Sequence, residues 1–192
     1  MPNIKRFEVE EFLIRRIRLI DLRAFFRMGS DYEITKYLNW GTLKRLSDAR
    51  FMLLHKLIIY KRKQKLPSTC SIITKKGGKC IGWIEFFNDY QMADGIMLGF
   101  LLDRAYQGLG IMSKILPKVL DICYNRLGYN KVLMQTISLN ERACKLITKL
   151  GFQCIQTLNY NHNNGKEVLI CKQLVYAQTK EGYKKWLIES KG

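Results

Sequence analysis

The sequence has few of the residues from which metal sites and nucleophile–histidine pairs are built. It contains only two histidines, His55 and His162, and no Cys-x-x-Cys pair. Because zinc sites usually cluster their ligands in pairs, a zinc site is disfavoured. Sequence distance leaves a Ser-His-Asp or Cys-His arrangement open, but no nucleophile motif supports one. The cysteines lie among apolar neighbours, so we expect reduced and mostly buried thiols. They are Cys70, Cys80, Cys123, Cys144, Cys154 and Cys171.

Long apolar runs are also absent. No apolar run approaches the roughly 20 residues of a membrane-spanning helix. The first residues mix Lys5 and Arg6 with Glu8, Glu10 and Glu11, a pattern of neither a secretory nor a transit signal. We therefore expect a cytoplasmic protein without membrane association and without a metal. A length of 192 residues, with 47% hydrophobic and 26% charged residues, suits a single domain over 1–192.

Acidic residues are scarce beside basic ones. There are 16 Asp and Glu against 33 Lys and Arg, which gives a net charge of +17. The excess is spread along the chain, with 15 basic and 7 acidic residues over 1–64 and 18 and 9 over 65–192. The densest basic run, Lys61–Lys65, ends an expected helix, where the helix dipole favours cations. Two interpretations stay open: a solvated helix end, or a basic surface for a ribosome or other acidic protein, with nucleic acid as the weaker alternative.

One segment combines a strand, two glycines and a helix. The apolar run Leu98–Leu102 predicts a buried strand, and apolar residues recur at helical spacing over Met112–Leu127. Gly108 and Gly110 lie between them. A glycine turn that opens a helix offers free N–H groups and a positive dipole end to a phosphate. The P-loop needs four residues between its glycines, and the Rossmann motif needs a third glycine where Ser113 stands, so neither applies.

Two blocks carry a family resemblance. Gln107-Gly108-Leu109-Gly110-Ile111-Met112 resembles the Gln/Arg-x-x-Gly-x-Gly/Ala coenzyme A motif of the GCN5-related N-acetyltransferase (GNAT) superfamily, with Met112 departing at the last position. The block Asn140–Phe152 resembles the family's Asn-x-x-Ser, helix and Lys-x-Gly-Phe. The similarity covers roughly residues 10–175. Within the superfamily, the chain looks like the ribosomal-protein-alanine (RimJ/RimL-like) branch.

The resemblance implies an α+β fold in three layers. Its sheet is mixed and mostly antiparallel, with about seven strands, helices on both faces and two splayed central strands. The core spans about 10–175, followed by a C-terminal helix at about 178–190. Acetyl-CoA is implied as the acetyl donor. The implied coenzyme A-binding residues are Phe100, Leu101, Leu102, Gln107, Gly108, Leu109, Gly110, Ile111, Met112, Ser113, Asn140 and Lys145. The alternative for Asn140 is a plain N-cap of the helix that follows it, and the alternative for Ser113 and Lys145 is a solvent-facing side chain.

The resemblance also implies direct attack of an amine on the thioester in a ternary complex. The branch places a Glu where Met97 stands, so Glu85 on the neighbouring strand is the candidate catalytic base. If it faces the cleft, burial would strengthen it as a base; the alternative is that it points to solvent. The family's serine is Ala143 here. Tyr106 and Tyr124 are candidate proton donors without positional support, and solvent is the alternative.

The absence of a strong catalytic base bears on which amine can be the acceptor, because the attacking amine must be neutral. A free α-amine has a pKa near 8, so about a tenth is neutral at pH 7, whereas a lysine amine is neutral in well under about one part in a thousand. A protein N-terminal α-amine, of the ribosomal-protein type, is therefore favoured. The alternatives are a polyamine or aminoglycoside acetyltransferase and a non-catalytic acyl-CoA-binding module on a ribosome or nucleic acid. Monomer and homodimer both stay open. The aromatic residues Tyr37, Trp40, Trp83, Phe86 and Phe87 either line the acceptor pocket or belong to the core.

The pattern of apolar and turn residues predicts the following elements. Strands are expected at 12–18, 70–74, 80–87, 96–102, 132–137, 152–158 and 168–175. Helices are expected at 21–29 with Asp21 as N-cap, 47–60 with Ser47 and Asp48 as caps, 112–127, 141–150 and 179–189. The helix at 47–60 is expected to carry Phe51, Leu54, Leu57 and Ile58 on one apolar face.

Overall fold

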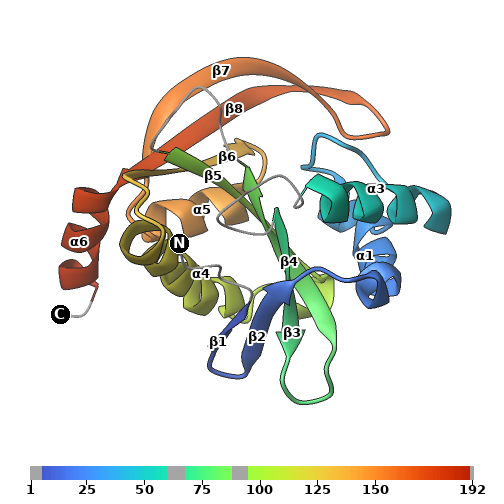
Figure 1. Ribbon diagram of the computed structural model, residues 1–192. Helices are drawn as coiled ribbons and strands as arrows, with labels where there is room; N and C mark the ends of the chain where they lie inside the picture. The colour runs from blue at the N-terminus through green and yellow to red at the C-terminus, as the bar shows by residue number, and fades with distance from the viewer. Residues whose placement is uncertain (1–5, 60–67, 88–94, 191–192) are drawn as a thin grey trace.

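The computed structural model describes residues 6–59, 68–87 and 95–190, which form one eight-stranded sheet with helices on both faces (Figure 1). The strands are β1 (Arg6–Val9), β2 (Phe12–Arg16), β3 (Thr69–Thr74), β4 (Cys80–Phe87), β5 (Gly95–Leu102), β6 (Lys131–Ile137), β7 (Gln153–Asn163) and β8 (Val168–Thr179). Their order across the sheet is β1-β2-β3-β4-β5-β6-β8-β7. Every neighbouring pair is antiparallel except β5 and β6. The mixed, mostly antiparallel sheet is confirmed, with eight strands instead of about seven.

Helices cover the two faces of the sheet in two groups (Figure 1). The helices are α1 (Leu22–Gly29), α2 (Tyr32–Thr35), α3 (Leu46–Ile59), α4 (Ile111–Asp121), α5 (Glu141–Lys149) and α6 (Lys180–Glu189). Side chains of α1, α2 and α3 share one buried cluster with Trp83 and Leu101 of the central strands. Side chains of α4, α5 and α6 share a second cluster, with Ile84 and Leu98 from the same two strands. Because successive strand residues point to opposite faces, neighbouring positions on β4 and β5 fill different cores.

The helix after the glycine turn forms as its apolar spacing predicts. The side chains that α4 buries recur three and four residues apart. They are Ile111, Met112, Ile115, Leu116, Val119 and Leu120. The α-helix ends at Asp121, and a π-helical turn continues over Ile122–Arg126, close to the predicted end at Leu127.

Three parts of the predicted element map were wrong or missing. The short elements β1 and α2 were not expected, and β7 and β8 run further than the apolar residues indicated. The apolar face of α3 was assigned wrongly: Phe51 is 74% exposed and Ile58 61% exposed, while Ala49 and Leu53 are buried. The helix is apolar on several sides, so spacing alone did not identify the buried one. Its expected end at Tyr60 and the basic run 61–65 lie outside the described residues.

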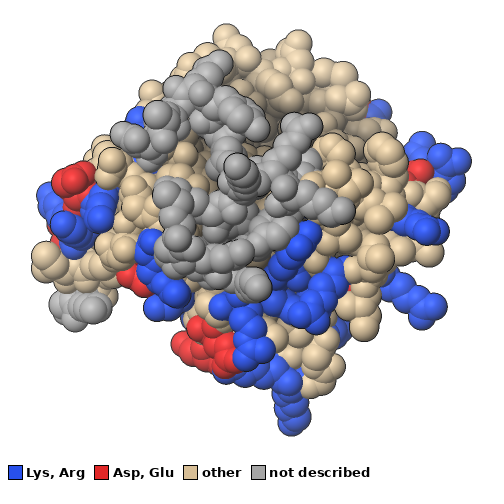
Figure 2. Space-filling view, viewed as in Figure 1, with Lys and Arg blue, Asp and Glu red and all other residues tan. Residues whose placement is uncertain are grey.

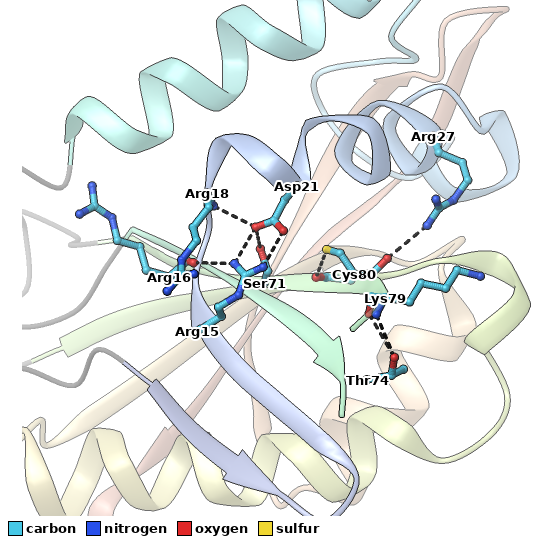
Figure 3. Close-up of polar contacts among 10 residues, drawn as sticks. Arg15, Arg16, Arg18, Asp21, Arg27, Ser71, Thr74, Lys79 and Cys80 are labelled. Atoms are coloured by element: carbon cyan, nitrogen blue, oxygen red, sulfur yellow. Dashed lines mark hydrogen bonds and ion pairs between the residues drawn. The ribbon is translucent and has the colours of Figure 1, made fainter. Parts of the chain in front are cut away.

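A buried carboxylate joins α1 to the sheet (Figure 3). Asp21 accepts two hydrogen bonds of 2.8 Å from the Arg15 guanidinium, one of 2.8 Å from the Ser71 hydroxyl and one of 2.9 Å from the Arg18 N–H. The residue precedes α1, as predicted, but its side chain makes no capping bond to that helix. Burial by itself would raise the pKa of Asp21, yet the hydrogen bonds from Arg15, Arg18 and Ser71 outweigh it and lower the pKa.

The C-terminal helix α6 packs on its own domain. The Tyr183 ring stacks on Tyr124 with centroids 5.0 Å apart, and Trp186 Nε1 donates a 2.9 Å hydrogen bond to the carbonyl of Lys149. These two contacts hold the helix against α5 and against the turn that follows α4. Across the described residues, no helix combines the length and the apolar character needed to cross a membrane.

Candidate functional site

The glycine turn presents a row of unused backbone donors. Gly108 has φ 78° and Gly110 has φ 71°, a left-handed conformation that residues with a Cβ rarely adopt. Gly110 is the N-cap of α4, whose first N–H groups have no intrahelical acceptor. No described residue accepts a hydrogen bond from any N–H of residues 108–113. These six donors, at the positive end of a helix, form an anion-binding surface.

Gln107 holds the turn against the end of β5. Its amide nitrogen Nε2 donates a 2.9 Å hydrogen bond to the carbonyl of Leu102, and its Oε1 accepts one of 3.3 Å from the Arg142 guanidinium. One amide side chain thus connects β5, the turn and α5. Gln107 therefore stabilises the turn through these two hydrogen bonds even when no ligand is bound.

β5 and β6 separate halfway along their length. They pair in parallel only between Gly95–Leu98 and Lys131–Met134, although β5 continues to Leu102. Beyond this point β6 remains paired with β8 as far as Ile137. The splayed strands expected from the resemblance are present in the structure. Beyond Leu98, no strand among the described residues pairs with the edge of β5 that faces β6.

The direction of the backbone decides which residues of β5 face the gap. The N–H of Asp103 donates a 2.8 Å hydrogen bond to the carbonyl of Ile81, on the β4 side. Since backbone groups alternate in direction along an antiparallel strand, those of Leu101 also face β4, whereas those of Phe100 and Leu102 face the gap. Of the three predicted β5 residues, Phe100 and Leu102 therefore direct their backbone groups into the gap. Leu101 directs only its side chain toward the cavity.

A cavity of about 140 Å³ lies where the strands diverge. It is bounded by β4, β5 and β6, by the start of α5 and by the segment after α2. Its lining residues are Tyr37, Leu38, Trp40, Trp83, Glu85, Leu98, Gly99, Phe100, Leu101, Met134, Gln135, Thr136, Asn140, Ala143 and Ile147. Of the five predicted aromatic residues, three lie here; Phe86 belongs to the core, and Phe87 is 47% exposed and outside the lining.

Asn140 combines the two roles considered for it. Its side-chain oxygen accepts a 3.3 Å hydrogen bond from the N–H of Ala143, so it caps α5. No described residue accepts from its amide nitrogen Nδ2, and the side chain lines the cavity. Asn140 can therefore cap the helix and donate a hydrogen bond to a ligand at the same time.

Glu85 faces the cavity and is ion-paired. It lies opposite Gly99 across β4 and β5, and its side chain is 16% exposed. Its Oε1 forms an ion pair and hydrogen bond with the Lys56 ammonium of α3. Met97 lies two residues from Gly99 and thus on the same face of the sheet. A carboxylate from β4 therefore stands close to the place where the family's β5 glutamate was expected.

Comparison with known proteins assigns the family. The family described as "Acetyltransferase (GNAT) domain" matches residues 11–153. The chain belongs to the GNAT acetyltransferase family. An uncharacterized N-acetyltransferase, p20 of Bacillus licheniformis, is 28% identical over 144 residues, covering 75% of this chain and 80% of that protein.

Solved structures share the fold of this GNAT acetyltransferase. A GNAT-family acetyltransferase from Bacillus anthracis superposes with a TM-score of 0.78 at 17% identity, covering 92% of this chain and 99% of that one. The ribosomal-protein-S5-alanine acetyltransferase of Vibrio fischeri gives 0.74 at 18% identity, covering 93% and 98%. The spermidine N-acetyltransferase of Vibrio cholerae, solved with CoA and spermine, gives 0.73 at 15% identity, covering 91% and 99%.

The remaining candidates of this GNAT acetyltransferase lie away from the cavity. The Lys145 side chain is 81% exposed and lies 3.6 Å from the Glu141 carboxylate, while Ser113 is half-buried in the first turn of α4. The Tyr124 hydroxyl donates a 2.7 Å hydrogen bond to the carbonyl of Gln178, and burial raises the pKa of Tyr124. Tyr106 also lies outside the lining. Neither tyrosine is placed to give a proton in the cleft.

Sequence reasoning missed two contributors to this GNAT site. Lys56 lies in a helix that carries no motif, and Arg142 lies inside the Asn140–Phe152 block at a position that the motif does not specify. Arg142 stands two residues after Asn140, a spacing that places the two side chains on different sides of a helix, so no local signal marked it. Over the described part of the chain, no three His, Cys, Asp or Glu side chains gather in a group that could hold a metal ion.

Proposed function

We propose that this acetyltransferase uses acetyl-CoA as donor and a protein N-terminal α-amine as acceptor. The observation that carries the donor assignment is the pairing of two features around one gap. One is the row of free N–H groups at residues 108–113, and the other is the unpaired edge of β5. The first suits a pyrophosphate and the second suits the amide-containing pantetheine arm of coenzyme A.

The donor-binding roles follow from these groups. The N–H groups of Gly108–Ser113 hold the pyrophosphate, while the Phe100 carbonyl and the Leu102 N–H hydrogen-bond the pantetheine amides. Asn140 donates its free Nδ2–H to the same arm. Arg142, already bonded to Gln107, and the exposed Lys145 add positive charge on the α5 side of the turn.

Acetyl-CoA supplies a thioester, whose acetyl group passes to the amine without a covalent enzyme adduct. The amine nitrogen forms a C–N bond to the acetyl carbon, the C–S bond breaks, and one proton leaves the nitrogen while the departing sulfur gains one. The Phe100 N–H, directed into the gap, is placed to stabilise the charge on the carbonyl oxygen. Glu85 orients the amine and takes its proton, either directly or through water.

The lining of the cavity favours a singly charged acceptor. Glu85 is the one acidic side chain among the described lining residues, and the Lys56 ammonium already pairs with it. A polyamine carries several charged amines at pH 7 and loses its hydration on entry, so it needs several carboxylates. An α-amine brings at most one charge, and the peptide behind it can lie against Tyr37, Trp40 and Trp83. The Vibrio fischeri neighbour is a ribosomal-protein acetyltransferase, which agrees with this choice.

The test is acetyl transfer with a matched set of amines. Full-length protein is incubated with acetyl-CoA and Ala- or Ser-starting peptides, spermidine or an aminoglycoside, and thiol release and product mass are followed. An N-terminally blocked peptide with an internal lysine is the control. We expect acetylation of the free α-amine and a higher kcat/KM for the peptides than for spermidine.

Three other outcomes would each contradict part of the proposal. Preference for spermidine or for an aminoglycoside would replace the acceptor class by the small-molecule alternative, and the Vibrio cholerae neighbour makes spermidine a specific candidate. Micromolar binding of acetyl-CoA without transfer to any amine would indicate the non-catalytic binding module, in keeping with Met97 and Ala143 at the family's base and acid positions. Failure to bind acetyl-CoA would overturn the donor assignment.

A further inference from the structure

The strand β7 is exposed over most of its length, with Tyr160 half-buried and one residue fully buried. Of its eleven residues, only His162 is buried, with 1% of its surface accessible. A buried imidazole in a mostly exposed edge strand needs a polar partner, because an unpaired polar group is costly to bury. The partner lies far away in sequence, at the end of α2.

His162 Nε2 lies 2.6 Å from the carbonyl oxygen of Lys36. Since a carbonyl only accepts, Nε2 carries the proton and donates it. Lys36 is the C-cap of α2, a helix of four residues whose last carbonyls lack helical partners. His162 therefore caps this helix end from a strand 126 residues further along the chain.

Hydrogen bonds within the tip of the β7–β8 hairpin, and a contact from the tip to α2, stabilise the region around His162. Asn164, buried at 4% exposure, accepts hydrogen bonds from the N–H groups of Lys166 and Glu167 at 2.9 and 3.0 Å. The Lys166 ammonium lies 3.9 Å from the centre of the Tyr32 ring, at the start of α2. One end of the hairpin thus contacts both ends of this short helix.

The segment that follows α2 lines the acceptor side of the cavity. Tyr37, Leu38 and Trp40 contribute to the lining. The hydroxyls of Thr35 and Thr42, which flank the segment on either side, form a 2.7 Å hydrogen bond with each other. Over the described residues, no other hydrogen bond connects this segment to the β7–β8 hairpin. We propose that His162 is a positioning residue that sets the acceptor-lining segment Lys36–Gly41 and thereby the affinity for the acceptor.

The role in acceptor affinity rests on the proposed function, whereas the tether itself can be tested without any acceptor. The variants are His162→Leu, which removes the donor at similar volume, and His162→Gln, whose amide can donate in its place. Hydrogen–deuterium exchange is measured over 36–41 and, as an internal reference, over 107–121. Exchange in 36–41 should rise on the order of tenfold in His162→Leu, with little change in the reference segment and recovery in His162→Gln.

The kinetic arm uses an Ala-starting peptide and acetyl-CoA. His162→Leu should raise KM for the peptide while the Kd for acetyl-CoA by calorimetry stays within about twofold, and His162→Gln should restore KM. Unchanged exchange in 36–41, or an equal rise in both segments, would overturn the tether. If exchange rises locally while peptide KM is unchanged, the positioning role is refuted. A wild-type protein that acetylates no peptide would defeat the proposed acceptor and leave the exchange result standing.

Discussion

Asp21 shows how a single buried charge joins distant parts of the N-terminal half. It is 4% exposed, and its hydrogen bonds come from β2, the following turn and β3. Arg15, its ion partner, has a side chain 13% exposed. Removing one member of such a pair leaves the other buried and uncompensated, which is costlier than losing an exposed pair.

Asp21→Asn should lower the free energy of unfolding by about 3 kcal/mol at pH 7, measured by urea denaturation. The folded-state pKa of Asp21 is lowered, so its contribution is complete above the unfolded pKa near 4 and is lost as pH falls through the folded value. The difference between wild type and variant should therefore shrink below about pH 4. The matched control is Glu10→Gln, which breaks the exposed pair with Lys114 and should change stability little at any pH. A constant difference from pH 7 to pH 3 would contradict this account.

Glu85 and Lys56 are the residue pair on which the proposed chemistry depends. Glu85→Gln keeps the shape and removes the carboxylate, so kcat for an Ala-starting peptide should fall about 100-fold with the Kd for acetyl-CoA unchanged. Steady-state kinetics and calorimetry measure the two effects. Lys56→Met is the partner variant: it leaves Glu85 without its ammonium, so spermidine should become a better acceptor relative to the peptide. An unaltered kcat in Glu85→Gln would remove the residue from the mechanism.

At the scale of elements, the glycine turn and α4 act as one unit. The turn is local in sequence, its φ angles require glycine, and the helix behind it is held by six buried apolar side chains. The space beside Gly108 and Gly110 is open, so glycine is needed for backbone conformation here and not to avoid a clash within the protein.

Gly110→Trp should abolish acetyl-CoA binding, because the indole would cover the free N–H groups and strain the turn. Isothermal titration measures the loss against micromolar binding in the wild type. Gly128→Trp is the matched control, since Gly128 has φ 74° and equally open surroundings but lies away from the cleft. Because both variants carry similar backbone strain, a loss of acetyl-CoA binding in both would indicate an effect on folding. Retained binding in Gly110→Trp would contradict the proposal that the turn binds the pyrophosphate.

Strands and helices whose apolar residues recur at a regular spacing were predictable from the sequence, whereas those without such a spacing were not. β4, β5, β6 and α4 follow their apolar residues closely. β7 was predicted only to residue 158 because its second half is polar, yet it pairs with β8 to Asn163. The buried face of α3 was decided by which side met α1, a choice that its all-round apolar sequence does not contain.

At the scale of the whole molecule, charge is the dominant feature. Figure 2 shows Lys and Arg side chains gathered over the region of β1–β3 and again at both sides of the molecule, with smaller groups of Asp and Glu beside them. A net charge of +17 gives the surface a positive potential that draws acidic partners over a distance of about a Debye length. We propose that this surface attracts the body of an acidic acceptor protein, while the cavity receives its N-terminus.

Two peptides with the same Ala-starting N-terminus, one with an acidic tail and one with a neutral tail, should separate these effects. We expect a lower KM for the acidic peptide at 50 mM salt and nearly equal KM values at 500 mM, because salt screens the long-range attraction. kcat should be similar for both, since the reacting group is the same. A KM difference that persists at high salt would instead indicate local contacts of the tail.

Features that depend on neighbouring residues could be predicted from the amino-acid sequence. The glycine turn, its helix, the cap at Asn140 and the β3–β4 hairpin follow from local conformation and from apolar spacing, and the motif blocks identified the family correctly. Contacts between residues far apart in the chain became visible only in the folded protein. Glu85 meets Lys56 across 29 residues, and His162 meets Lys36 across 126. Such contacts depend on the order of strands and on which face each element buries, and no local pattern specifies either.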